Sequence, residues 1–499
     1  MTVGSSKTIP AFYAGQSIFL TGGTGFLGKI LIEKILRSCP DVREIFVLIR
    51  SKKGLTINER FEKLLNLPIY DKLRKEHFSS FEKIIPISGD ASEKELGLSV
   101  ADRQMLVERV TIIIHAAASV QFNNSLKYAI CTNTRATRDI CILAQSVKNL
   151  KALVYISTAF AHFNKAFIEE KVYPPIADWR KMIEMAETLD EHTLNVFMAK
   201  CLYYAPNTYI FSKNLAESII QEYSSSLSCA IIVRPSIVGP SLDEPIPGWI
   251  DNVYGPMGLF IVGGKGILRV AYLNKTVDED VIPVDVVIKA TLVVIWKLIT
   301  STVGSSSFVL NCTSQQCNTF GQDIQMLFDI TKKEIPLEGV IWTPHTILID
   351  NFVQFYTLTI LLHILPAILI DLVLKFSGRR PMLLQLLRRI YVANCAVSYF
   401  SFHNWKFSNV NGLSLMSLIP PENREEFTPQ FYGYNRINYI KNSIIGVKKF
   451  LLHEDVNFLQ LDAVKARNKR VFLLVRVIKT ILSIGVLWII YRWIYFYTL

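Results

Sequence analysis

Six short runs of aliphatic and β-branched residues, separated by stretches with helical periodicity, constrain the fold of the first half of the chain. These runs are apolar at nearly every position, which is typical of strands covered on both faces. Strands of this kind, joined by crossover helices, form a parallel sheet with helices on both sides. The sequence therefore predicts a doubly wound, Rossmann-type α/β fold. The six predicted strands are residues 17–20, 44–49, 83–88, 111–118, 152–157 and 229–235.

A glycine-rich turn, T-G-G-T-G-F-L-G at residues 21–28, joins the first predicted strand to a helix. Glycine allows a tight turn and lets backbone N–H groups approach a pyrophosphate, and the helix directs the positive end of its dipole there. A purely structural turn is the alternative, but the strand-turn-helix context favours a dinucleotide site. The predicted contacts are Thr21, Gly22, Gly23, Thr24, Gly25, Phe26, Leu27 and Gly28.

The end of the second predicted strand favours NADPH over NADH. Arg50 stands where an acidic residue would accept bonds from the ribose hydroxyls of NAD, and Lys52 and Lys53 follow it. These cations are suited to the 2′-phosphate of NADP. A solvated basic loop is the alternative, because basic clusters are common on surfaces.

The ends of the third and fourth predicted strands supply further expected cofactor contacts. The carboxylate of Asp90 can accept a bond from the adenine amino group, and His115, Ala116 and Ala117 mark a place where small residues let the backbone pass close to a dinucleotide. We interpret the His115 ring as a packed core histidine rather than a catalyst.

Tyr209 and Lys213 form a Y-x-x-x-K pair, which places both side chains on one face of a helix. An ammonium beside a phenol increases its acidity, so the phenol can give a proton to a carbonyl oxygen that has gained a hydride. Lys213 would also bond the nicotinamide ribose. The hydroxyl of Thr158, or of Ser157 if the register differs, would hold that oxygen. A surface pair on a helix is the alternative, which the dinucleotide turn upstream disfavours.

Beyond about residue 341 the strand pattern gives way to long segments rich in Leu, Ile and Phe, which predicts a mainly helical second domain. Residues 351–376 are nearly continuously apolar, but His363, Pro366 and Asp371 favour a buried or interfacial helical pair over a membrane span. The predicted domains are a catalytic domain at 15–345 with a substrate-binding extension, a helical domain at 346–455, a basic linker at 456–479 and a membrane segment at 480–499.

The last twenty residues are long enough to cross a hydrocarbon core of roughly 30 Å and carry one charge, Arg492. The alternative is an amphipathic hairpin of residues 471–479 and 481–499 lying in the interface. Both tether the chain to membrane lipid. The basic residues that precede this segment, as expected of a cytosolic flank, are Lys465, Arg467, Lys469, Arg470, Arg476 and Lys479. Its expected aromatic belt consists of Trp488, Tyr491, Trp493, Tyr495 and Tyr497.

The charge of +12 does not by itself identify a partner, but no arginine-rich run interleaved with aromatics predicts nucleic-acid binding. The eight cysteines form no C-x-x-C pair and no histidines stand at zinc-like spacing, so we expect reduced thiols and no metal site. Residues 1–16 lack the features of a secretory signal, which predicts a cytosolic catalytic domain.

Taken together, the motifs at 21–28, H-A-A-A-S-V-x-F at 115–122, Y-I-S-T-A-F at 155–160, Y-x-x-x-K at 209–213 and I-V-R-P-S-I-V-G at 232–239 identify a family resemblance. The chain resembles the extended short-chain dehydrogenase/reductases, and more closely the fatty acyl-CoA reductases. The resemblance covers about residues 15–452. It includes E-P-I-P-G-W-I-D-N at 244–252, similar to a substrate-side loop, and N-W-K-F at 404–407, similar to the family's helical domain.

The resemblance implies that long-chain acyl-CoA is reduced by NADPH in two hydride transfers, through an aldehyde, to a primary alcohol. It implies the endoplasmic reticulum membrane, although peroxisomal relatives exist. Asn133 is expected to have a structural or cofactor-positioning role. Pro235 and Ile237 are expected to contact the cofactor. The expected substrate contacts are Ser119, Pro247, Gly248, Trp249 and Lys265. We expect Lys265 to contact CoA phosphates, and an ordinary surface turn at residues 264–266 is the alternative.

Two other functions are compatible with parts of this pattern. A membrane-bound sterol or sugar-nucleotide dehydrogenase would share the turn and the Tyr/Lys pair, but the helical C-terminal module disfavours it. A catalytically idle NADPH-binding scaffold would turn over no acyl-CoA. The joint presence of Tyr209, Lys213 and Thr158 disfavours that reading.

Overall fold

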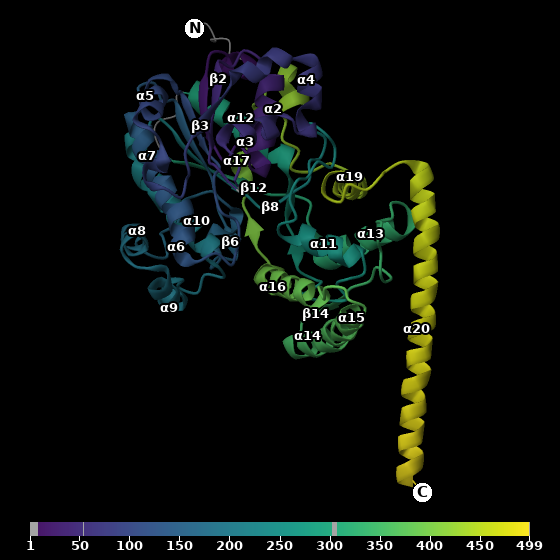
Figure 1. Ribbon diagram of the computed structural model, residues 1–499. Coiled ribbons are helices and arrows are strands. Elements are labelled where there is room, and N and C mark those ends of the chain that lie inside the picture. The colour runs from purple at the N-terminus through teal and green to yellow at the C-terminus, as the bar shows by residue number, and fades with distance from the viewer. Residues whose placement is uncertain (1–7, 53, 302–306, 499) are drawn as a thin grey trace. The chain divides into compact units, whose positions relative to one another are not determined.

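A computed structural model of the chain describes residues 8–52, 54–301 and 307–498. Lys53 and Leu499, and the side chain of Tyr497, lie outside the described part. The chain divides into two compact units, each assembled from separate stretches of sequence (Figure 1). The first contains residues 1–250, 280–317 and 404–434, and the second contains residues 251–279, 318–403 and 435–499.

The division differs from the predicted boundary at residue 345, because non-local strand pairs bind distant segments together. In the first unit, β15 (Lys406–Phe407) pairs with β6 (Phe167–Ile168). In the second unit, β14 (Ile347–Ile349) pairs with β9 (Val270–Tyr272). The region beyond residue 341 is mainly helical, as predicted, but it includes the short strands β14 and β15, for which the sequence has no clear signal.

The first unit is built on a parallel sheet in the order β12-β7-β5-β4-β1-β2-β3. Six of these strands confirm the sequence prediction, and β12 was not predicted. Strands β1, β2, β4, β5 and β7 are buried at every residue, as expected for a sheet covered on both faces. The strands are β1 Ser17–Thr21, β2 Glu44–Ile49, β3 Ile84–Ser88, β4 Ile112–His115, β5 Ala152–Ile156, β7 Ala230–Pro235 and β12 Phe308–Cys312.

Helices cover both faces of this sheet: α2 packs with α12 on one face, and α5, α7 and α10 pack together on the other (Figure 1). The remaining strands of the unit are β8 Ile237–Gly239 and β11 Val281–Pro283. Its helices are α1 Ile9–Tyr13, α2 Phe26–Ser38, α3 Ile57–Leu65, α4 Asp71–Glu76, α5 Val100–Arg109, α6 Leu126–Ala129, α7 Ala136–Ser146, α8 Trp179–Thr188, α9 Glu191–Cys201, α10 Thr208–Tyr223, α12 Val284–Thr300, α17 Val410–Ser417 and α18 Arg424–Phe427.

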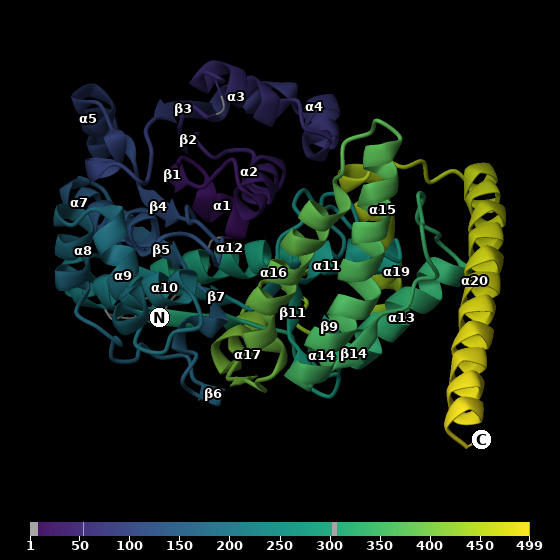
Figure 2. The ribbon, with the colours of Figure 1, turned by 60° about the horizontal axis from the view of Figure 1, so that its bottom comes forward.

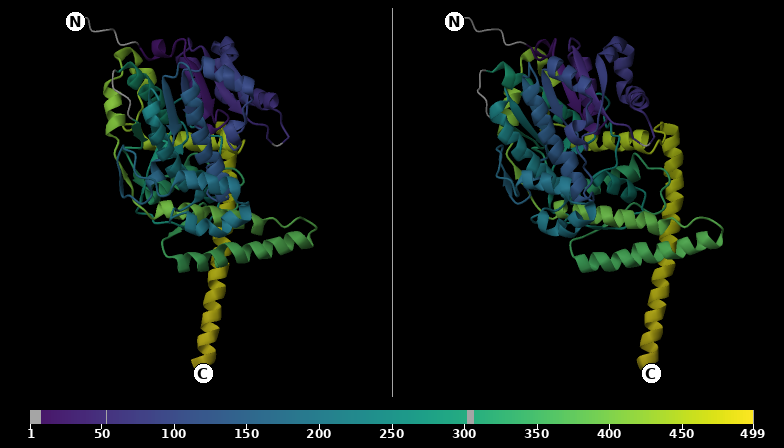
Figure 3. Two further views of the ribbon diagram at one scale, coloured as in Figure 1. Left: turned by 90° about the vertical axis from the view of Figure 1, so that its left-hand side faces the viewer. Right: turned by 60° about the vertical axis from the view of Figure 1, so that its left-hand side comes forward.

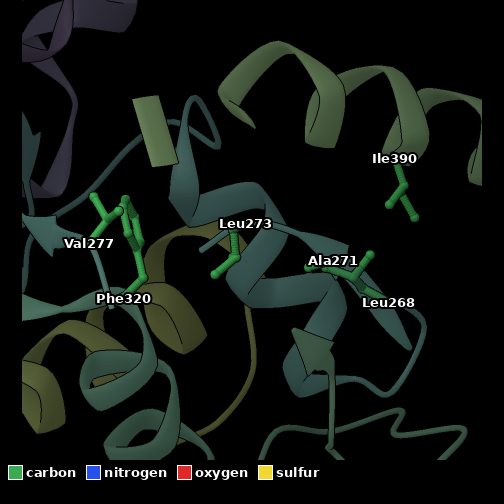
Figure 4. Close-up of a cluster of buried hydrophobic side chains, with 6 residues drawn as sticks. All are labelled: Leu268, Ala271, Leu273, Val277, Phe320 and Ile390. Atoms are coloured by element: carbon green, nitrogen blue, oxygen red, sulfur yellow. The ribbon is translucent and has the colours of Figure 1, made fainter. Parts of the chain in front are cut away.

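The second unit is mainly helical, and one of its apolar clusters joins β9, α13 and α16. Leu268, Ala271 and Leu273 come from β9 and its flanks, Phe320 from α13 and Ile390 from α16 (Figure 4). Helices α15 and α16 lie side by side (Figure 2). The helices are α11 Pro256–Gly264, α13 Phe320–Lys333, α14 Phe352–Thr359, α15 Leu365–Phe376, α16 Leu383–Ser401, α19 Arg436–Gly446 and α20 Phe458–Thr498. The short strands β10 Asp278–Glu279 and β13 Asn318–Thr319 pair with each other.

Two helical stretches of the second unit are long and apolar enough to cross a membrane by length and composition. They are Phe352–Phe376, which comprises α14, a π-helical turn and α15, and Gln460–Phe496 in α20. The second contains most of the predicted membrane segment.

Candidate active site

The glycine turn lies at the carboxyl end of β1, between β2 and β4, where the strand order of the sheet reverses. Gly22 has a φ of +77°, and a Cβ there would lie 2.7 Å from the backbone of Ala116 and Ala117 after β4. A Cβ on Gly28 would lie 2.3 Å from the Gly22 carbonyl oxygen. The chain therefore requires glycine at both positions.

The N-cap residue of α2 is Gly25, which has no side chain that could cap the helix. The N–H groups of the first turn, which begins with Phe26 and Leu27, are left to bind water or a ligand. An anion there would also be stabilised by the helix dipole. The turn and helix thus fit the pyrophosphate of a dinucleotide.

His115 is fully buried and holds β4 against its neighbours. Its Nδ1 lies 2.7 Å from the Thr21 hydroxyl and its Nε2 lies 3.2 Å from the Thr137 hydroxyl. Thr21 Oγ1 also accepts a bond from the Ala117 N–H at 3.2 Å. Burial, with a smaller effect of the Lys213 charge, lowers the pKa of His115 to about 3, so the ring is neutral at neutral pH.

Two arginines crowd together at the end of β2. Arg50 Nη1 donates to Asp90 Oδ2 at 3.0 Å. Arg60, in α3, donates to the Arg50 carbonyl oxygen and lies 3.5 Å from the Thr24 hydroxyl. Burial and the charge of Arg50 lower the pKa of Arg60, so a bound anion would stabilise both guanidinium groups. Lys52 is exposed on the following loop.

Arg60 was not predicted from the sequence. The sequence nevertheless indicates the position of Arg60, because Thr56 and Glu59 form a capping box that begins α3 directly after the basic loop. Arg60 therefore lies in the first turn of a helix that starts beside the end of β2.

Tyr209 lies in the first turn of α10, where Asn207 caps the helix by accepting a bond from the Ile210 N–H at 2.9 Å. The Tyr209 ring stacks on Phe122, with centroids 6.0 Å apart. Burial raises the pKa of Tyr209, and a hydrogen bond with Thr158 acts in the opposite direction. The phenol is therefore protonated at neutral pH.

Lys213 is buried one helical turn after Tyr209. Its Nζ donates to the Ile156 carbonyl oxygen at 2.6 Å and lies 4.5 Å from the centroid of the Tyr155 ring. Burial lowers the pKa of Lys213 to about 7, although the charge of Glu217 acts in the opposite direction. Tyr209, Lys213 and Thr158 are thus brought together at the carboxyl end of β5.

Ser157 faces a different group from Thr158. Its hydroxyl donates to Glu217 Oε1 at 2.5 Å. Arg234 Nη2 donates to Glu217 Oε2 at 2.6 Å, and His162 Nε2 lies 2.8 Å from the same oxygen. We call these four residues the Glu217 cluster. Ser157 is therefore held by Glu217, and Thr158 is the hydroxyl that acts to lower the pKa of Tyr209.

The Glu217 cluster connects the elements that carry the catalytic candidates: α10, the end of β5, the 3₁₀ turn Ala159–His162 and β7. The side chains of Glu217 and Arg234 are fully buried. The sequence prediction did not include Glu217, His162 or Arg234. Glu217 follows Tyr209 by eight residues on the same helical face, and Arg234 interrupts an apolar strand. A charged residue at each of these positions indicates a buried ion pair, because a buried charge needs a partner.

Asn133 holds the loop after β4 against α10. Its Oδ1 accepts a bond from the Ser119 N–H at 2.8 Å, and its Nδ2 donates to the Ser212 hydroxyl at 2.9 Å. Ser212 precedes Lys213 in α10. Asn133 therefore links Ser119, a predicted substrate contact, to the helix of the Tyr/Lys pair.

The predicted substrate-side loop is fixed to α12. The Asp285 carboxylate, at the start of α12, accepts bonds from the N–H groups of residues 242, 243 and 244 at 2.8–3.0 Å. Pro247 is exposed, whereas Gly248 and Trp249 are buried, and the Trp249 N–H donates to the Ser241 hydroxyl at 2.9 Å.

The other predicted contacts lie on different elements. Pro235 ends β7 opposite Cys312, and Ile237 begins β8 opposite Val281. Lys265 belongs to the second unit, where its ammonium forms an ion pair with Glu454 at 3.0 Å.

Comparison with known proteins identifies the family. Two family models, both described as male sterility protein, match the chain. The first, an NAD-binding model, matches residues 20–291, and the second matches residues 362–454. The chain is 39% identical over 453 residues to fatty acyl-CoA reductase 1 of Homo sapiens, covering 90% of this chain and 87% of that protein. It is 38% identical over 452 residues to fatty acyl-CoA reductase 2 of Mus musculus, with the same coverage.

Solved structures with the same fold include reductase domains. The terminal R domain of the myxalamid biosynthetic pathway has a TM-score of 0.56 at 19% identity, covering 87% of this chain and 91% of that one. A reductase domain of a non-ribosomal peptide synthetase from Mycobacterium tuberculosis has a TM-score of 0.55 at 17% identity, covering 88% and 92%. By its relatives and its nicotinamide-cofactor fold, the chain belongs to the fatty acyl-CoA reductase family of oxidoreductases.

Proposed function

We propose that the protein reduces long-chain acyl-CoA to a primary alcohol and free CoA with NADPH. The observation that carries this proposal is the position of Lys213, whose Nζ donates to the Ile156 carbonyl oxygen at the end of β5, one helical turn after Tyr209 and at the sheet edge that also holds the glycine turn. The relatives named fatty acyl-CoA reductases support the substrate class.

The residues of the chain act on the carbonyl oxygen of the substrate. The hydroxyls of Thr158 and Tyr209 donate hydrogen bonds to it and stabilise its developing negative charge. When bound, NADPH supplies a hydride to the carbonyl carbon in each of two reductions. After the first, the tetrahedral centre expels CoA and leaves an aldehyde. After the second, Tyr209 gives its proton to the oxygen and the alcohol forms. Lys213 would bond the nicotinamide ribose and stabilise the tyrosinate.

Thr21–Gly28 would hold the pyrophosphate, and Arg50 with Arg60 would bind the 2′-phosphate of NADPH. Replacing Arg60 by alanine should therefore raise the KM for NADPH about 10- to 100-fold, the value of one charge-assisted hydrogen bond. The KM for NADH should stay within about twofold, because NADH lacks that phosphate. Initial rates with each cofactor measure both constants. An equal rise for NADH would mean that Arg60 only supports the turn.

Lys213 should give the reaction a pH dependence. Its pKa of about 7 means that the ammonium loses its proton as the pH rises through neutrality. We expect kcat/KM for acyl-CoA to fall on the alkaline side of about pH 7. Lys213→Arg should abolish this alkaline decrease in kcat/KM, because a guanidinium stays charged. The overall rate of the variant should be lower. If the alkaline decrease persisted in the arginine variant, it would be due to the titration of a group other than Lys213.

The second unit is proposed to anchor the enzyme. Residues 480–498 of α20 would cross the endoplasmic reticulum membrane, leaving the catalytic unit in the cytosol. The apolar residues of this unit would shelter the acyl chain, and Lys265 would contact CoA phosphates by exchanging its partner Glu454 for them.

The reaction is tested by incubating the full chain with NADPH and a series of acyl-CoA thioesters, and measuring alcohol and aldehyde by mass spectrometry. We expect alcohol as the product, with CoA released in equal amount. NADPH binding without turnover of any thioester would contradict the proposal and favour the idle scaffold.

A further inference from the structure

The helix at residues 352–376 is buried along one narrow stripe that repeats every fourth residue. Side chains spaced by four share one side of a helix. The members of this stripe are Phe355, Thr359, His363, Ala367 and Asp371, each less than 8% exposed. Three of these five residues are polar, so the protein-facing side of the helix includes buried polar groups.

Directional bonds within the second unit hold this stripe in place. His363 Nε2 accepts a bond from the Arg269 N–H at 2.8 Å. Asp371 accepts bonds from the N–H groups of Met382, Leu383 and Leu384 at 3.0 Å and thereby caps α16. Phe355 stacks on Tyr391, with centroids 5.7 Å apart.

The opposite side of the helix is apolar and exposed. Positions offset by two residues, about 200° around a helix, face away from the buried stripe. These positions hold Thr357, which is exposed, and five apolar residues that are 46–72% exposed, Val353, Leu361, Leu365, Leu369 and Val373; Phe376 beyond them is 89% exposed. Apart from Gln354, Tyr356 and Thr357 near its start and Lys375 at its end, the exposed side of the helix is apolar. An apolar surface of this length requires a covering.

The anchor helix α20 indicates what covers this surface. Its first half packs along one side against the rest of the second unit, where Asn468 Nδ2 donates to the Leu337 carbonyl oxygen at 3.1 Å and Lys479 Nζ lies 5.7 Å from the centroid of the Trp342 ring. After Lys479 its described apolar side chains are exposed as far as Phe496. Figure 3 shows α14 and α15 running across the direction of α20, level with its middle, where the packed half ends.

We propose that residues 352–376 lie in the plane of the bilayer interface, with the stripe from Val353 to Phe376 inserted among the lipids, as a second membrane contact beside α20. Exposed cations at Lys375, Arg379 and Arg380 continue from its end and suit anionic headgroups. A transmembrane orientation is disfavoured, because it would break the bonds of His363 and Asp371 and place a carboxylate in hydrocarbon. This proposal depends on the proposed membrane anchor α20 in one respect: α20 sets the position of the membrane plane.

The test places an environment-sensitive fluorescent amino acid at Val353, Leu365 or Phe376 of the full chain, one position at a time, in phosphatidylcholine vesicles. The vesicles contain lipids brominated either near the headgroup or near the bilayer centre. We expect shallow bromines to quench all three positions at least about twofold more than deep bromines. Ile489 in α20 serves as the deep control, and Gln325, exposed on α13, as the aqueous control.

Each outcome decides between distinct arrangements. Stronger quenching of Leu365 by deep bromines would show a membrane span and overturn the proposal. Absence of quenching at all three positions, with Ile489 quenched, would also overturn it, because protein such as a second copy of the chain would then cover the surface. Quenching at the three positions with Ile489 unquenched would support the in-plane helix and contradict the anchor by α20 instead.

Discussion

Replacing Tyr209 by phenylalanine should lower kcat for alcohol formation by about 10²- to 10⁴-fold, the usual contribution of a general acid. The phenol is the group that gives its proton to the carbonyl oxygen, and Thr158 alone cannot replace it because its hydroxyl is far less acidic. The dissociation constant of NADPH should change by less than about threefold, because the ring that stacks on Phe122 remains. Product analysis and a fluorescence titration measure the two quantities.

The matched control is Tyr223→Phe, which removes a phenol at the other end of the same helix. It should leave kcat unchanged. A Tyr209 variant that kept more than about a tenth of the wild-type rate would remove the tyrosine from the mechanism.

Replacing Glu217 by glutamine should reduce the free energy of unfolding by about 3–5 kcal/mol, because it leaves the guanidinium of Arg234 buried without a counter-charge. Arg234 and His162 hold the pKa of Glu217 well below its usual range against the opposing effect of burial. The carboxylate therefore contributes its stability at neutral pH and loses it only in acid. Urea unfolding of the detergent-solubilised chain measures the difference.

Glu222 provides the comparison for this prediction. It lies in the same helix and pairs with Arg180, but both side chains are about half exposed. Glu222→Gln should cost at most about 1 kcal/mol, as is usual for exposed ion pairs. Equal losses for the two variants would mean that the Glu217 cluster is not a buried charge network.

The sheet could be predicted from the sequence because its strands are apolar on both faces, a pattern that depends on local sequence alone. The glycine turn and the Tyr209/Lys213 pair could be found for the same reason, since both are defined by short spacings. The division into two units could not, because it depends on pairs such as Lys406 with Phe167 that lie far apart in the chain. The contact of Ser157 with Glu217 depends on the direction in which a hydroxyl points at the end of a strand. The spacing of residues in the sequence does not determine that direction.

We expect the residues at the end of β5 to support two successive reductions of one carbonyl carbon. The most direct measurement uses full chain in vesicles, palmitoyl-CoA and NADPH that carries deuterium at the transferred position. The mass of the alcohol is then determined. We expect alcohol with two deuterium atoms on its terminal carbon. An aldehyde with one deuterium as the only product, or no deuterated product from any acyl-CoA, would contradict it.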